Sequence, residues 1–121
     1  MTILDTASPK TLEWLEKIKS KVIKEIDSIQ YNEAENWVSF RSQVTRRNIA
    51  YLEPFKKQIR LFTELPLSYD DRLESTPASQ IWAKAYPSVF KILQESDIEK
   101  AVYFIVHSYN YDLTKRSLTE I

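Results

Sequence analysis

The sequence predicts an α+β fold, an antiparallel sheet of about four strands with an N-terminal and a C-terminal helix packed on one face. Three observations predict this class. Apolar residues recur at helical spacing near both ends of the chain, and short segments in the middle alternate apolar and polar residues. The link "EPFKK" between two of the alternating segments is short enough for an antiparallel hairpin.

The first expected element is a helix over "SPKTLEWLEKIKSKVIKEIDSIQ", residues 8–30. Ser8 is a suitable N-cap, and Pro9 suits the first helical position. The expected apolar stripe consists of Leu12, Leu15, Ile18, Val22, Ile26 and Ile29. The charged residues between these positions predict a solvent-exposed opposite face.

Three strands are expected next, over residues 36–42, 47–54 and 57–65. Alternation places Val38, Phe40, Ile59 and Leu61 on the side that faces the helices. The other side of these strands would carry Trp37, Arg41, Arg60 and Phe62.

The second half of the chain predicts fewer strands. Residues 66–79 carry turn signals and acidic side chains, which predict an exposed loop with about one helical turn. Residues 80–93 show a strand pattern interrupted at Pro87, and residues 96–112 predict the closing helix. We expect one domain over residues 1–121, with flexible ends at 1–7 and 113–121.

The composition excludes several classes of site. The chain has no glycine, so it lacks the loops that cradle phosphates and the nucleophile elbow of hydrolases. It has no cysteine and one histidine, which argues against disulfides, thiolate chemistry, zinc and a Ser-His-Asp triad. We therefore expect a non-enzymatic protein without metal or cofactor, in which His107 is a surface residue with no role.

The N-terminus lacks the pattern of a signal peptide, and no segment has the roughly 20 apolar residues that a membrane span needs. These features predict a soluble cytoplasmic protein without membrane contact. The 17 basic and 17 acidic residues cancel, so nucleic-acid binding would require a local basic surface.

Such a surface is the first candidate site. Trp37, Arg41, Arg60 and Phe62 would share the open face of the sheet, with Arg46, Arg47, Lys56 and Lys57 around its ends. Arginine beside exposed rings is typical of protein interfaces, including homodimers, and of single-strand nucleic-acid binding. A third interpretation is that the rings cover one another and the arginines only keep a sheet edge soluble.

A second candidate site is a small-ligand pocket between the sheet and the closing helix. Its lining would be Trp82, Tyr86 and Tyr103. Of these hypotheses, contact with a protein partner or a second copy leads, and nucleic-acid binding and ligand binding are the alternatives.

Three segments together resemble a known family. "NWVSFRS", "RRNIAYLEPFKKQIRLF" and "SDIEKAVYFIVHSYNYD" are similar to a small prokaryotic domain of unknown function labelled "predicted transport protein". The resemblance covers residues 29–111 and implies a domain that stands alone or is fused to restriction-type nucleases. That context implies an accessory or recognition module. The family commonly has glycines between its third and fourth strands, where this chain has "WAKAYPSV".

Overall fold

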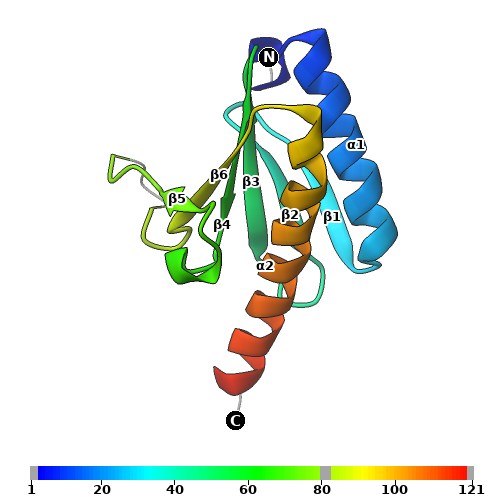
Figure 1. The fold of residues 1–121 in the computed structure, drawn as a ribbon. Helices are drawn as coiled ribbons and strands as arrows, with labels where there is room; N and C mark the ends of the chain where they lie inside the picture. The colour runs from blue at the N-terminus through cyan, green and yellow to red at the C-terminus, as the bar shows by residue number, and fades with distance from the viewer. Residues whose placement is uncertain (1–2, 80–82, 120–121) are drawn as a thin grey trace.

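One antiparallel sheet and two covering helices make up the computed structural model, which describes residues 3–79 and 83–119 (Figure 1). Within these residues the sheet has six strands in the order β1-β2-β3-β4-β6-β5. All neighbouring strands are antiparallel. The α+β class is therefore confirmed, whereas the expectation of about four strands was too low.

The helical elements are η1 (Ile3–Thr6), α1 (Pro9–Glu25), η2 (Leu67–Tyr69), η3 (Glu95–Asp97) and α2 (Ile98–Thr119). The strands are β1 (Ile29–Glu33), β2 (Val38–Ser42), β3 (Asn48–Pro54), β4 (Ile59–Thr63), β5 (Glu74–Ser75) and β6 (Ser88–Ile92). Both α-helices lie on the same side of the sheet (Figure 1).

The first helix begins where the sequence predicts but ends earlier. Ser8 accepts a hydrogen bond from the backbone of Thr11, and the Thr11 side chain accepts one from the backbone of Ser8, which completes a capping box. The helix ends at Glu25, and Ile29 opens β1 instead of closing the helical stripe. An apolar residue at position 29 fits both a helical and a strand period, so the pattern alone could not separate them.

The two additional strands lie at the edges of the sheet. β1 pairs with β2, and β5 is a two-residue strand that pairs with the start of β6. β5 falls in the segment expected to be a loop, since a two-residue strand leaves no detectable alternation. Of the expected strand over residues 80–93, the described residues 83–93 contain β6, after Pro87, and residues 80–82 lie outside the described part of the chain.

The main core lies between the sheet and the helices. Val38, Phe40, Ile59 and Leu61 are buried in it, on the side that alternation predicts. Across the interface, the rings of Phe90 on β6 and Phe104 on α2 meet edge to face, with centroids 5.1 Å apart.

A smaller apolar cluster covers part of the outer face of the sheet. It consists of Phe62, Val89 and Tyr86, and Tyr51 packs against it. These side chains therefore cover β4 and β6 on the side of the sheet that faces away from the helices.

The closing helix is longer than predicted. It runs over 22 residues, which gives a length of about 33 Å. β3, with seven residues, spans about 23 Å. The last turns of α2 therefore extend past the end of the sheet (Figure 1), and residues 113–119, expected as part of a flexible end, belong to the helix. No helix in the described part of the chain is both long and apolar enough to cross a membrane.

Two leucines of α1 give a matched test of this packing. Leu15 is buried, while Leu12 is 38% exposed. We expect Leu15→Ala to lower the free energy of unfolding by about 2–5 kcal/mol, because it removes core contacts and leaves a cavity. Leu12→Ala should change it by less than about 1 kcal/mol. Urea unfolding followed by circular dichroism measures both, and equal losses would contradict the assigned face of the helix.

Candidate functional site

The predicted basic residues do not form one continuous surface. Arg46 and Arg47 precede β3, whereas Lys56 and Lys57 follow it. The two pairs therefore lie at opposite ends of a strand about 23 Å long.

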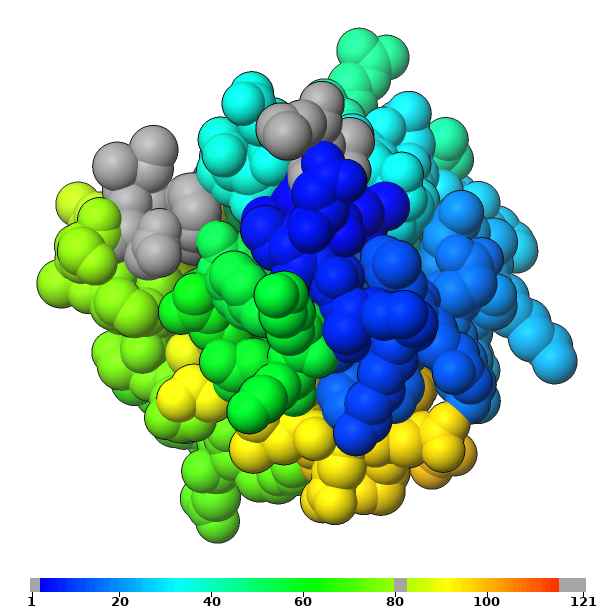
Figure 2. Space-filling model, turned by 90° about the horizontal axis from the view of Figure 1, so that it is seen from above, coloured from blue at the N-terminus to red at the C-terminus, as the bar shows by residue number. Residues whose placement is uncertain are grey.

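The Lys56–Lys57 end is tied to the start of the chain. The Ser8 hydroxyl donates to the carbonyl of Lys56 (2.8 Å), and the Thr6 hydroxyl donates to the carbonyl of Pro54 (2.6 Å). Figure 2 shows this end of the molecule, with η1 and the start of α1 (blue) against the β3–β4 turn (green). Both lysine side chains are exposed here.

Arg60 has neighbours within its own hairpin. Its Nε lies 3.6 Å from a carboxylate oxygen of Glu53, its partner across the strands. Its guanidinium lies 4.8 Å from the ring centre of Phe55. The charge of Arg60 is thus largely compensated within the protein, which weakens its use as a phosphate contact.

The aromatic residues of the outer face are more covered than expected. Phe62 lies on the predicted side but is fully buried, which corrects the expectation that it would be open to a partner. The cause is Tyr86, which packs over it. Trp37 meets Tyr51 edge to face at 5.3 Å and is half-buried, as is Arg41 on the same strand face.

Of the expected ligand-pocket residues, Tyr86 and Tyr103 do not line one cavity. Tyr86 belongs to the outer cluster, and its hydroxyl donates to the carbonyl of Asn48 at 2.6 Å. Tyr103 lies on the solvent side of α2, so the sheet separates the two residues. Trp82 lies outside the described residues.

An exposed aromatic cluster instead lies along α2. Tyr103, His107 and Tyr111 follow one another every four residues on this helix, and Tyr69 from η2 lies beside them. We call these four residues the tyrosine strip. The three tyrosines are 37–41% exposed. Leu67, at the start of η2, is also exposed.

His107 holds the strip together. Its Nδ1 forms a hydrogen bond with the hydroxyl of Tyr69, and its ring stacks on that of Tyr103 at 4.0 Å. On the other side of Tyr103, the ammonium group of Lys100 lies 4.6 Å from the ring centre and forms an ion pair with Asp70 at 2.7 Å. The sequence predicts a surface histidine with no role, and the structure adds that His107 is half-buried and contacts Tyr69 and Tyr103. The four-residue spacing of the aromatic residues was the available signal.

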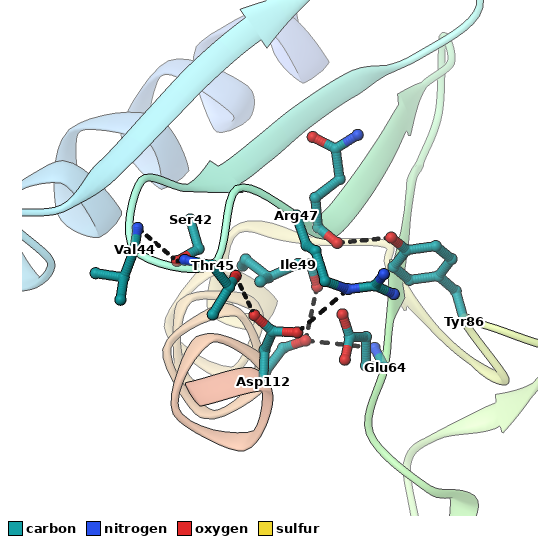
Figure 3. A network of polar contacts seen from close by, with 10 residues as sticks. Ser42, Val44, Thr45, Arg47, Ile49, Glu64, Tyr86 and Asp112 are labelled. Atoms are coloured by element: carbon teal, nitrogen blue, oxygen red, sulfur yellow. Dashed lines mark hydrogen bonds and ion pairs between the residues drawn. The ribbon is translucent and has the colours of Figure 1, made fainter. Parts of the chain in front are cut away.

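A buried polar network lies at the other side of the helix (Figure 3). Asp112 is fully buried, accepts a hydrogen bond from the hydroxyl of Thr45, and lies 3.6 Å from Nε of Arg47. Ser108, one turn earlier, accepts from the backbone N–H of Glu64 and donates to the carbonyl of Ile49. These contacts fix the C-terminal half of α2 to β3 and to the end of β4.

Glu64 carries the unusual chemistry of this network. It is 5% exposed, and neither of its carboxylate oxygens accepts a hydrogen bond from a donor that the structure describes. Burial, followed by the charge of Asp112, raises the pKa of Glu64 to about 7, and the charge of Arg47 opposes this rise. A proton on Glu64 supplies the donor that a carboxyl–carboxylate pair with Asp112 requires.

Sequence reasoning missed this pair, because Glu64 and Asp112 lie far apart along the chain and no motif links them. Its burial keeps both carboxyl groups away from any large substrate, and no group of three or more His, Cys, Asp or Glu in the described ranges could hold a metal ion. The pair is best explained as a proton-dependent contact that fastens α2.

Comparisons with protein-family models, with curated proteins and with solved structures gave no match. The likeness to a prokaryotic domain family stays a prediction, and the site must be interpreted from its own geometry.

The pair of Glu64 and Asp112 predicts a specific dependence of the free energy of unfolding on pH. Between pH 4.5 and about 7 the folded protein keeps a proton on Glu64 that the unfolded chain has released. Raising the pH through this range therefore favours the unfolded chain, with a loss of about 3 kcal/mol in the free energy of unfolding.

The variant Glu64→Gln provides the comparison, since its amide can donate to Asp112 at every pH. We expect the variant to lose this pH dependence and to exceed the wild type in stability at pH 8. Urea unfolding between pH 4 and pH 8 measures the difference. Parallel curves for the two proteins would contradict the shared proton.

Proposed function

We propose that this chain is a non-enzymatic binding module that acts through contact with protein, and that the tyrosine strip is its contact surface. The observation that carries this proposal is the group of three tyrosines, each more than a third exposed, around His107. A protein that used these rings only for its own packing would bury them more completely.

The chemistry of the strip suits a protein partner. Tyrosine is enriched at protein interfaces because its ring buries a large apolar area while its hydroxyl can still form a hydrogen bond. His107 and Lys100 restrain the ring of Tyr103 before binding, which reduces the entropy lost on association. The mechanism is burial of the rings at the centre of the contact, with hydroxyl hydrogen bonds at its rim.

The distribution of charge favours protein over nucleic acid. Single-strand binders combine stacking rings with a continuous basic groove. Here the two basic pairs lie at opposite ends of β3, and Arg60 faces Glu53. Of the lysines near the tyrosine strip, Lys100 already faces Asp70, and the charge of Lys115 acts on Glu64. The proposal is for a cytoplasmic protein, in agreement with a chain that has no cysteine.

A photo-reactive side chain tests the proposed surface. Tyr111 would be replaced by a benzophenone amino acid in the native cells, and a second protein would carry the same group at Lys57. Lys57 is a suitable control because it is exposed at the β3–β4 turn, away from the strip. We expect a discrete protein adduct from position 111 after illumination and none from position 57.

Mass spectrometry would identify the species joined to the chain. Absence of an adduct from position 111, or equal adducts from both positions, would contradict a protein contact at the strip. An adduct with nucleic acid in place of protein would favour the alternative function.

A further inference from the structure

β1 forms an open edge of the sheet. The strand order begins with β1 and ends with β5, so within the described residues each of these strands has one neighbour. β5 has only two residues, and short edge strands are a common way to prevent pairing with other chains. β1 has five residues, spans about 17 Å, and carries no proline, lysine or register shift. The described chain therefore leaves one long edge available to a further strand.

The hydrogen bonds at the two ends of β1 show which of its backbone groups point outward. The N–H of Gln43 donates to the carbonyl of Ser28, and the N–H of Ala34 donates to the carbonyl of Trp37. In an antiparallel pair, residues that bond to the partner strand alternate with residues whose N–H and C=O groups point away. The even-numbered residues of β1 therefore bond to β2. The residues that direct both backbone groups to the open edge are Ile29, Tyr31 and Glu33.

One side of α1 borders this edge (Figure 1). The ammonium group of Lys19 lies 4.6 Å from the ring centre of Tyr31, and Glu16 is close enough for its charge to act on the Tyr31 hydroxyl. Tyr31 is half-buried, whereas Phe40, its neighbour on β2, is fully buried. The cover that α1 gives to the sheet therefore ends at β1.

This side of α1 is complementary to itself. Its residues lie within about 60° of one another around the helix axis, and they are Leu12, Glu16, Lys19 and Ile23. Leu12 and Ile23 are 38% and 45% exposed. Along the chain the order is apolar, acid, base, apolar. A second copy of α1 that runs in the opposite direction therefore places Glu16 against Lys19, and Leu12 against Ile23.

We infer that a second copy of this chain pairs with the open edge, β1 against β1, with a two-fold axis at Tyr31. An interface with two-fold symmetry places residue i of one copy against residue j of the other, and j against i. Ile29 of one copy then lies opposite Glu33 of the other, and Tyr31 lies opposite itself. The two sheets join into one, and both α1 helices lie on the same side of it. The inference goes beyond the proposed function, since it concerns a different surface.

The strand and the helix define the same axis. A shift of the strand register by one residue would set outward-directed groups against groups that already bond to β2. A shift by two residues would leave one of the three outward residues unmatched. On α1 the centre of symmetry lies between Glu16 and Lys19, the two residues that approach Tyr31. One axis therefore gives about six backbone hydrogen bonds, two for each residue pair, together with two Glu16–Lys19 contacts.

Amide hydrogen exchange followed by NMR tests the strand pairing in the unmodified protein. The N–H groups of Gln30 and Asn32 are an internal control, because they bond to β2 whether or not a second copy is present. In the dimer we expect the N–H groups of Ile29, Tyr31 and Glu33 to exchange as slowly as these two. A dimer in which the three outward groups exchange about a hundredfold faster than the control groups would overturn the pairing of β1 with β1.

A charge exchange tests the contact between the two α1 helices. We expect Glu16→Lys and Lys19→Glu each to weaken the dimer about tenfold in sedimentation equilibrium, because each replaces two attractive contacts by repulsive ones. The double variant should recover most of the affinity. The control is Lys24→Glu, at an exposed position of α1 about 80° or more around the helix from the four contact residues. It should leave the dissociation constant unchanged. Loss without recovery in the double variant would overturn the antiparallel helix contact.

These outcomes are independent of the proposed function. A protein that stays monomeric at about 1 mM overturns the inference, because an edge with about six added hydrogen bonds should associate well below that concentration. The proposed function would still stand if the photo-adduct from position 111 were found. A dimer with protected outward groups but no adduct from position 111 would support the inference and reject the tyrosine strip as a contact surface.

Discussion

The contact of Asp112 with Thr45 and Arg47 is the constraint on which the orientation of α2 depends. A helix is rigid, so fixing one side chain fixes the direction of the others. Asp112 lies about 140° around the helix from His107. When the carboxylate is held against the β2–β3 loop, His107 and its neighbouring tyrosines must point away from the sheet. The buried network on one side of α2 therefore determines that the tyrosine strip lies on its exposed side.

This anchoring works without glycine. Arg46 adopts a positive φ of 62° in the β2–β3 loop, a conformation that usually costs a residue other than glycine about 1–2 kcal/mol. The turn brings Arg47 beside Asp112, and the Ser42 hydroxyl accepts hydrogen bonds from the backbone of Val44 and Thr45. These contacts offset the strain. The proton on Glu64 removes the repulsion that a second buried carboxylate would add.

The sequence predicts the parts of the fold that depend on local periodicity. Val38, Phe40, Ile59 and Leu61 lie where alternation places them, because each strand buries one face. Three elements were not predicted: β1, since Ile29 fits two periods; β5, since two residues show no pattern; and the last turns of α2, since residues 113–119 are mostly polar. The pairing of Glu64 with Asp112 depends on long-range packing, which one sequence does not encode in any visible motif.

Aromatic residues are covered to different degrees on the outer face of the sheet and on the outer side of α2. On the sheet, Tyr86 covers Phe62 and Trp37 packs against Tyr51, so these rings are in contact with one another. On α2, stacking with His107 and the hydrogen bond to Tyr69 restrain the rings but leave three tyrosines more than a third exposed. Rings that are held in place yet still exposed gain more from a partner than rings that are already buried. This difference is the reason why we propose a contact surface on the helix and not on the sheet, where alternation alone would place it.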